Sequence, residues 1–217
     1  MNMKQDTRNF NNLLSDLTVQ RIPQNAEDKS RLFQLFSLRY EEYHQWVKPP
    51  FDKILLDKDP FDDVVDCHYG ILHDNTLAAC QRIILRPQPY MLEYAYDGRF
   101  SGLKIEPNSA EVSRAVVREE YRNKKVSDMF RGHTALSFLH REAYRICLEK
   151  DIEWIYFASV SNVVRLALIE GFPFETIAES TLENGDVIVV ARLSWREFER
   201  KLSSKAKGLK MLEWFQS

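Results

Sequence analysis

The sequence predicts an α/β protein of the α+β sandwich class, in which a mostly antiparallel, twisted sheet carries helices on both faces. Two pairs of alternating apolar segments are joined by short turns rich in Asp and Asn, a pattern that is typical of β-hairpins. Between and after them lie segments whose apolar residues recur at helical spacing. Because a sheet and amphipathic helices bury their apolar faces against each other, these elements favour a layered α+β domain.

The composition fits one globular domain. The chain has 217 residues, of which 44% are hydrophobic and 29% are charged, enough for one sizeable core. We expect a single domain over residues 1–217, with a mobile N-terminal segment at 1–25 and a C-terminal tail at 203–217. The net charge of −2 argues against a general nucleic-acid binder.

Several classes of protein are disfavoured by what the sequence lacks. The three cysteines are odd in number and have no metal-ligand spacing, so we expect free thiols, a reducing compartment and no metal. No apolar run approaches the ~20 residues of a membrane span, and the N-terminus has no signal-peptide core. The glycine motifs of nucleotide hydrolases and dinucleotide oxidoreductases are absent. We therefore expect a cytoplasmic protein without a tightly bound cofactor.

The first predicted elements are a short strand and a helix. Residues 17–22 (LTVQRI) alternate in polarity and stop at Pro23, which predicts a strand. Asn25 can cap a following helix. The apolar face of this helix would comprise Leu32, Phe33, Phe36 and Tyr40. Residues 47–63 (VKPPFDKILLDKDPFDD) then predict a long ordered loop, a kind of loop that is usually functional or mobile.

The middle of the chain predicts a hairpin and then a strand of unusual composition. Residues 67–73 (CHYGILH) and 77–85 (LAACQRIIL) flank the turn DNT. Residues 109–117 (SAEVSRAVV) have the pattern of a strand but include Glu111 and Arg114. A basic turn and a long helical pattern at 126–150 follow. Helix N-termini offer free N–H groups and the positive end of a dipole, so this junction is a candidate site for a phosphate-bearing ligand.

The C-terminal part predicts a strand, a helix, a hairpin and a last helix. Residues 152–160 (IEWIYFASV) have the pattern of a strand, and 161–172 (SNVVRLALIEGF) that of a helix with Gly171 as its C-cap. The segments FETIAEST and VIVVARL pair across the turn ENGD. Ser194 then caps the final helix. The predicted order is β, α, ββ, β, α, β, α, ββ, α.

Four short motifs occur in order between about Leu32 and Leu202. A helix contains SLRYEEY, a loop contains DKDPFD, a hairpin ends in RIILRPQPYML, and a strand contains EVSRA. Together with the distal stretch SVSNVVRLALIEGFPFETIAES, they resemble the motifs of the acyl-homoserine-lactone synthases. These enzymes are a branch of the GNAT-type N-acyltransferase superfamily, and their motifs are LR…F, E-x-D-x-x-D, RLL…PYML and ELSRF.

The chain departs from the family pattern at three places. The family has a Trp about ten residues after the helix Arg, whereas Trp46 lies seven residues after Arg39. Ala115 stands where ELSRF has Phe, and the aromatic expected after PYML is Tyr96 or Phe100. The related N-acyl amino acid synthases share the fold and the Glu/Arg strand but acylate an amino acid, so the acceptor stays open.

The resemblance implies acyl transfer to S-adenosylmethionine followed by lactonisation, which makes a bacterial quorum-sensing signal. It implies that Glu111 deprotonates the attacking amine, through a water. The implied catalytic residues are Glu111, Arg82, Arg114 and Ser113. The implied acceptor-binding residues are Arg39, Tyr43, Asp57, Asp59, Asp62 and Phe100. We expect one mixed-charge network formed by Arg39, Asp59, Asp62, Arg82, Glu111 and Arg114.

The implied donor is an acyl-phosphopantetheine thioester on an acidic acyl carrier protein. In this superfamily the pantetheine arm lies between two splayed strands, here about 109–117 and 152–160. Its phosphate and carrier would meet Arg118, Arg122, Lys124, Lys125, Ser127 and Arg131. Coenzyme A would suit the same residues, so the two donors are not separated. The acyl chain would contact Phe138, Trp154, Tyr156 and Phe157.

Each feature also has a purely structural explanation. Glu111 and Arg114 could form a salt bridge on the strand, DKDPFDD could be a solvated turn, and RNKK a solvated helix start. Three functions therefore stay open. They are an acyl-homoserine-lactone synthase, an N-acyl amino acid synthase of the same fold, and a non-catalytic acyl-binding or regulatory module.

Overall fold

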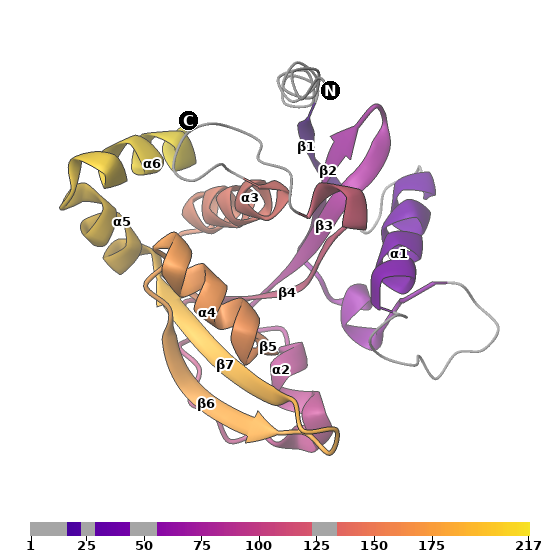
Figure 1. Ribbon diagram of the computed structural model, residues 1–217. Helices are drawn as coiled ribbons and strands as arrows, with labels where there is room; N and C mark the ends of the chain where they lie inside the picture. Colours follow the sequence, from indigo (N-terminus) through magenta and orange to yellow (C-terminus); the bar gives the residue numbers. More distant parts are fainter. Residues whose placement is uncertain (1–16, 23–28, 44–55, 123–133) are drawn as a thin grey trace, which may run out of the picture. The chain divides into compact units, whose positions relative to one another are not determined.

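The structure is a computed structural model that describes residues 17–22, 29–43, 56–122 and 134–217 (Figure 1). Its strands are β1 (Thr18–Ile22), β2 (Cys67–His73), β3 (Thr76–Leu85), β4 (Ser109–Val117), β5 (Trp154–Val160), β6 (Glu175–Thr181) and β7 (Val187–Ser194). Its helices are α1 (Ser30–Tyr43), α2 (Met91–Tyr94), α3 (Ala135–Glu149), α4 (Ser161–Glu170), α5 (Trp195–Ser203) and α6 (Ala206–Gln216). Short 3₁₀ turns are η1 (Pro60–Asp63), η2 (Tyr96–Gly98) and η3 (Glu119–Tyr121).

Seven strands among the described residues form one sheet in the order β1-β2-β3-β4-β5-β7-β6. The pairs β1–β2, β5–β7 and β6–β7 are antiparallel, whereas β4 and β5 are parallel. The predicted α+β fold with a mostly antiparallel sheet is therefore confirmed. The helices in the described ranges include none that is long and apolar enough to cross a membrane.

The chain divides into two compact units. The first comprises Met1–Asp62, Cys67–Arg82 and Arg114–Glu142, and the second comprises Asp63–Asp66, Ile83–Ser113 and Ala143–Ser217. In the first unit, α1 packs its apolar side chains onto β1, β2 and β3. The buried residues of that core are Ile22, Leu35, Phe36, Leu38, Leu72, Leu77, Cys80 and Val116.

The buried face of α1 differs from the predicted one. Phe33, expected in the core, is 60% exposed. The fully buried positions instead follow i, i+3, i+4 and i+7 from Leu35. They are Leu35, Leu38, Arg39 and Glu42, in addition to Phe36. The apolar pattern did not predict this face because two of the four positions are charged. Burial of these charges costs free energy unless each is paired, and their partners lie elsewhere in the chain. Asn25, the predicted cap, lies outside the described residues.

The turn between β2 and β3 has the geometry that its sequence predicts. Asp74 and Asn75 both have positive φ, at 47° and 64°. Two consecutive left-handed residues are characteristic of the hairpin turn whose twist matches that of the flanking strands, and Asp and Asn tolerate this conformation better than most residues. The turn therefore fixes the register that directs the His68 and Arg82 side chains.

In the second unit the predicted caps and hairpin are present. Gly171 ends α4 with φ 103°, and the Ser194 side chain accepts a hydrogen bond from the Glu197 amide at 3.1 Å to begin α5. β6 and β7 pair across the ENGD turn. The strands, the C-cap and the N-cap of this part of the chain were therefore predicted correctly.

The segment at 203–217, expected as a tail, forms α6 and belongs to the core of the second unit. Phe215 is fully buried and lies 5.0 Å, edge to face, from Phe198. Phe172 stacks on Phe198 at 5.3 Å, and Tyr144 meets Trp195 at 5.1 Å. These aromatic contacts bury α5 and α6 together. The sequence did not predict α6 because lysines interrupt its apolar pattern.

Candidate active site

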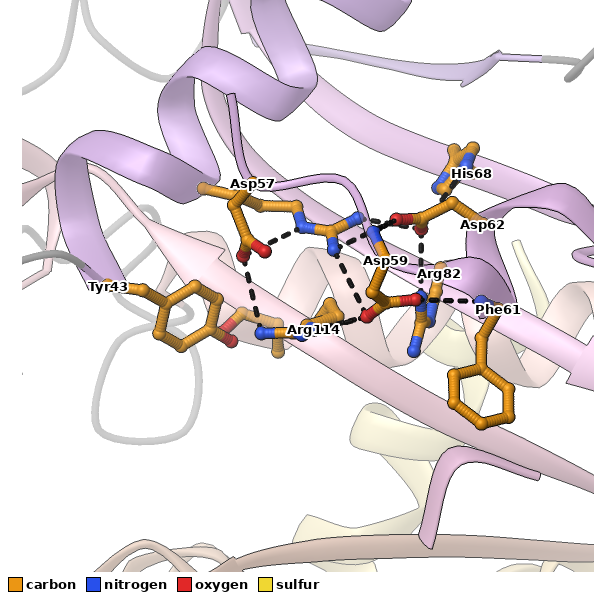
Figure 2. Close-up of polar contacts among 10 residues, drawn as sticks. Tyr43, Asp57, Asp59, Phe61, Asp62, His68, Arg82 and Arg114 are labelled. Carbon is orange, nitrogen blue, oxygen red and sulfur yellow. Dashed lines mark hydrogen bonds and ion pairs between the residues drawn. The ribbon is translucent and has the colours of Figure 1, made fainter. Parts of the chain in front are cut away.

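The first unit contains a buried cluster of arginines and aspartates at the end of α1 (Figure 2). Arg39 forms two hydrogen bonds with Asp62, Nη1 to Oδ1 at 2.8 Å and Nη2 to Oδ2 at 3.1 Å. Asp62 also accepts from Arg82 Nη1 at 2.8 Å and from the amide of Asp59 at 2.8 Å. Asp62 is thus a fully buried carboxylate that two arginines share.

The outer part of the cluster is formed by Asp57, Asp59 and Arg114. Arg82 Nη1 donates to Asp59 Oδ1 at 2.7 Å. Arg114 donates to Asp59 Oδ2 through Nε at 3.0 Å and Nη2 at 2.8 Å, and its Nη1 reaches Asp57 Oδ2 at 3.3 Å. The side chains of these outer residues are 15–25% exposed to solvent, whereas those of Arg39 and Asp62 are buried. A ligand from solvent would meet Asp57, Asp59 and Arg114 first.

The cluster is balanced in charge, with three arginines facing three aspartates. Burial alone would raise the pKa of Asp59, but the attraction and hydrogen bonds of Arg82 and Arg114 outweigh it and lower the pKa to about 2. Arg39 lowers the pKa of Asp62 in the same way against the effect of burial. Asp59 and Asp62 are therefore held in the charged form. The balanced cluster suits a ligand that brings both a cation and a carboxylate, because each charged group of such a ligand can replace a side chain of the same sign.

Arg114 reaches this cluster from a strained backbone. It has φ 54° within β4, a region that L-residues enter at a cost of roughly 1–2 kcal/mol. Its guanidinium lies 5.5 Å from the ring centre of Tyr43, whose hydroxyl donates to the Ala115 carbonyl at 3.2 Å. The last turn of α1 and the salt bridges to Asp57 and Asp59 together hold Arg114 in this conformation. Non-glycine residues in such a conformation cluster at functional sites.

Glu111 lies in the second unit, three residues earlier on β4. It is 1% exposed, and its Oε2 accepts a hydrogen bond from the Leu92 amide at 2.9 Å. In the parallel register Glu111 is opposite Tyr156 on β5. This pair is the last one between β4 and β5, although both strands continue through described residues. Over the described residues of β4, the pairing with β5 therefore ends at Glu111.

Two other predicted residues are buried in the second unit. Ser113 is 9% exposed and, two residues after Glu111, belongs to the same face of β4. Phe100 is 3% exposed and lies 5.8 Å, edge to face, from Tyr96. The aromatic residues after PYML thus form a pair. Tyr96 and Asp97 both have positive φ, at 55° and 57°, in the loop that presents them.

The predicted acyl-pocket residues on β5 do not share one face of the sheet. Side chains alternate along a strand, so Trp154 and Tyr156 lie on one face and Phe157 on the other. Phe157 packs 4.6 Å from Phe174 beneath α4, whereas Trp154 lies under the guanidinium of Arg192 at 4.8 Å. Phe138 is half-buried on α3. A single apolar pocket can include Phe157 or the Trp154–Tyr156 pair, but not all three.

The predicted basic cluster is partly neutralised by α1. Arg118 Nη1 donates to Glu41 Oε2 at 3.0 Å, and Arg122 donates to Glu42 Oε2. Glu42 also accepts from the Glu119 amide at 3.1 Å and is almost fully buried. Lys124, Lys125, Ser127 and Arg131 lie outside the described residues, as does Trp46. An acidic donor that uses Arg118 or Arg122 therefore has to compete with carboxylates of the protein itself.

The structure also brings His68 of β2 into the Arg–Asp cluster, a residue that the sequence analysis did not select. Its ring is 1% exposed, and Nε2 lies 3.8 Å from Asp62 Oδ1 (Figure 2). The available signal was a histidine at an inward position of an otherwise apolar strand. That signal was weak, because a buried histidine usually has a structural role.

Residues 38–131 match the family model described as "Acetyltransferase (GNAT) domain". This match covers the Arg–Asp cluster and Glu111. Residues 38–131 therefore contain a GNAT acetyltransferase domain, which is less than half of the chain. A sequence search of curated proteins finds no significant match. The chain is also similar to solved structures of acyl-homoserine-lactone synthases, and at this level of sequence identity the similarity shows a shared fold.

Three similar structures illustrate this shared fold. The AHL synthase LasI has 21% identity and a TM-score of 0.65, covering 82% of this chain and 89% of its own. BjaI, a CoA-dependent acyl-homoserine lactone synthase solved with SAM and isopentyl-CoA, has 16% identity and a TM-score of 0.69, covering 90% and 87%. ElaA of Escherichia coli has 19% identity and a TM-score of 0.57, covering 81% and 98%.

Proposed function

We propose that this GNAT-type acyltransferase makes an acyl-homoserine lactone from S-adenosylmethionine and an acyl-phosphopantetheine thioester. The observation that carries the proposal is the balanced cluster of three arginines and three aspartates, with Asp57, Asp59 and Arg114 on its exposed side. S-adenosylmethionine brings an ammonium, a sulfonium and a carboxylate. Carboxylates attract the first two, and an arginine binds the third through paired hydrogen bonds.

Acyl transfer begins with the amine of the bound acceptor. In the proposed reaction Glu111 takes a proton from this amine through one water, and the nitrogen attacks the thioester carbonyl. The tetrahedral intermediate collapses with cleavage of the C–S bond, and the thiol of the donor leaves with a proton. Because β4 and β5 no longer pair beyond Glu111, we assign the pantetheine arm and the oxyanion to the edge of β4 that faces β5.

Lactonisation follows within the acylated acceptor. The carboxylate oxygen attacks the γ carbon, and the bond from that carbon to the sulfonium sulfur breaks to release methylthioadenosine. No proton has to move in this step, so it depends chiefly on positioning. We assign the positioning of the carboxylate to Arg114, the most exposed arginine of the cluster, and that of the sulfonium to Asp57 and Asp59.

For the donor we propose an acyl carrier protein, with both substrates supplied in the bacterial cytoplasm. The CoA dependence of BjaI makes coenzyme A the alternative donor. Replacing Lys124 and Lys125 by Glu separates the two. With a carrier-protein donor, the apparent KM for acyl carrier protein should rise several-fold more than the KM for a short acyl-pantetheine thioester. Equal changes for the two donors would contradict docking of a carrier protein.

The purified protein tests the function directly. With S-adenosylmethionine and an acyl thioester, mass spectrometry should detect the lactone, methylthioadenosine and free thiol in equal amounts. A linear acyl amino acid without methylthioadenosine would make the protein an N-acyl amino acid synthase instead. Binding of the thioester without release of thiol, with the same binding by Glu111→Gln, would indicate a non-catalytic acyl-binding module.

A further inference from the structure

His68 occupies a buried position against the Arg–Asp cluster without taking part in its hydrogen bonds. Neither ring nitrogen has a hydrogen-bond partner among the described residues. The ring lies edge to face with Phe36 at 5.8 Å, and Nε2 is 3.8 Å from Asp62 Oδ1, about 0.6 Å too long for a hydrogen bond. Unsatisfied buried polar groups are rare in folded proteins and call for a physical reason.

Asp62 does not accept from His68 because its acceptor positions are already occupied. Oδ1 takes Nη1 of Arg39 and Nη1 of Arg82, both at 2.8 Å. Oδ2 takes Nη2 of Arg39 at 3.1 Å and the Asp59 amide at 2.8 Å. Two carboxylate oxygens offer about four lone-pair positions, so the set is complete. His68 can therefore bind Asp62 only after another donor has withdrawn.

The surroundings keep His68 neutral. Burial lowers its pKa to about 4, and although Asp62 opposes this effect, the positive charges of Arg39 and Arg82 add to it. The charged groups that face the ring are Asp62 from η1, Asp59 from the segment before it, Arg39 from α1 and Arg82 from β3. At neutral pH the imidazole thus has one N–H donor and one acceptor.

A bound carboxylate would free a position on Asp62 through a short series of exchanges. Arg114 makes its shortest hydrogen bonds with Asp59 Oδ2. If a substrate carboxylate binds Arg114 instead, Asp59 Oδ2 loses these two hydrogen bonds. Arg82 already bridges Asp59 and Asp62 from a single nitrogen, at 2.7 and 2.8 Å. It would then move toward Asp59, and Asp62 Oδ1, the oxygen next to His68, would lose a donor.

We propose that His68 is a positioning residue whose Nε2–H replaces Arg82 on Asp62 Oδ1 when the carboxylate of the acceptor binds Arg114. The exchange keeps the buried Asp62 satisfied in both states and so lets the cluster change partners without leaving a carboxylate unpaired. This inference rests on the proposed function, because it takes S-adenosylmethionine as the ligand of Arg114.

Nuclear magnetic resonance of the wild-type chain tests the exchange. In protein with ¹⁵N-labelled histidine side chains, the His68 Nε2–H signal, assigned by its absence in His68→Asn, should move downfield as S-adenosylmethionine is added. The titration itself uses the wild-type chain, and the variant serves only for the assignment of the signal. An unchanged His68 signal with S-adenosylmethionine bound would overturn the inference while the proposed function stands. If S-adenosylmethionine does not bind at all, both are wrong.

Kinetics of two His68 variants give a second test. His68→Leu removes the donor and should raise KM for S-adenosylmethionine about tenfold, the cost of one hydrogen bond to a charged group, with KM for the thioester unchanged. His68→Asn keeps an N–H donor and should restore most of the loss. His73→Asn, on the same strand, should have no effect and is the matched control. Equal losses in His68→Leu and His68→Asn, or a rise in both KM values, would indicate a structural role only.

Discussion

Arg39 on α1 binds Asp62 on η1 through two parallel hydrogen bonds, and the side chains of both residues are at most 1% exposed. A buried pair of this kind contributes little net stability compared with apolar packing, but it fixes the relative position of the two segments. The backbone supports the same junction, because the Asp57 amide donates to the Phe36 carbonyl at 3.1 Å. The aspartate segment is therefore held to α1 both by a side-chain ion pair and by a backbone hydrogen bond.

Replacing Arg39 by Ala should destabilise the protein strongly. The change leaves Asp62 as a buried carboxylate with one arginine fewer, a situation that typically costs 3–5 kcal/mol, so we expect a loss of about that size in the free energy of unfolding. Urea denaturation followed by circular dichroism measures it. Arg31→Ala, at the first turn of the same helix, removes only part-buried or exposed hydrogen bonds to Gln34 and Asn75, so it is the control and should cost no more than about 1 kcal/mol. A loss below about 1 kcal/mol in Arg39→Ala would mean that the pair is not buried in solution.

Local patterns predicted most of the elements of the fold. The β2–β3 turn, the Gly171 C-cap and the Ser194 N-cap each depend on residues next to one another in the chain, so their sequences suffice. The same holds for the strand pattern of 109–117. The acidic loop and the three arginines of the candidate site were selected by resemblance to a family, and the structure places them in one cluster.

Features that depend on distant partners were not predictable in this way. The inward direction of Arg39 and Glu42 on α1 becomes reasonable only when their partners Asp62 and Arg122 are known, 23 and 80 residues away. α6 was missed for a similar reason, because Phe215 becomes a core residue only beside Phe198 and Phe172. In each case tertiary contacts override the local pattern.

The left-handed backbone at Arg114 predicts an unusual order of stability for two variants. Arg114→Ala and Arg114→Gly lose the same guanidinium, but only glycine adopts φ 54° without strain. We expect Arg114→Gly to be more stable than Arg114→Ala by about 1 kcal/mol, by urea denaturation. At Val116, a strand position with ordinary φ, the order should reverse. If Arg114→Ala were the more stable, the strained backbone would not persist in solution.

Glu111 provides the central kinetic prediction. Glu111→Gln preserves the shape and can still accept a hydrogen bond from the Leu92 amide, but it cannot take a proton. We expect kcat for thiol release to fall by roughly 10²–10⁴, with KM for both substrates changed little. A matched control is Glu119→Gln in η3, which should retain activity. Normal turnover by folded Glu111→Gln would remove this residue from the role of base.

Two adjacent glutamates on α1 should differ in their effect on stability. Glu42 is buried and binds both Arg122 and the Glu119 amide, whereas Glu41 is 54% exposed and binds Arg118. Glu42→Gln should therefore lower the free energy of unfolding by about 1–3 kcal/mol, and Glu41→Gln by no more than about 1 kcal/mol. Thermal or urea denaturation compares the pair. Equal losses of stability in the two variants would mean that the Glu42–Arg122 pair is exposed to solvent rather than buried.

The neutral state of His68 predicts a pH dependence of stability. Its pKa is lowered from 6.5 to about 4 in the folded protein, so between these values the unfolded chain binds a proton that the folded chain does not. Stability due to this group is therefore complete above pH 6.5 and is lost as the pH falls toward 4. From pH 7 to pH 4.5, wild type should lose roughly 2–3 kcal/mol more than His68→Asn. Asp59, whose pKa is about 2, does not contribute in this window, and His140, with a pKa of about 4, is common to both proteins. Urea denaturation at the two pH values measures the difference, and a constant gap between wild type and His68→Asn would show that His68 is not held neutral.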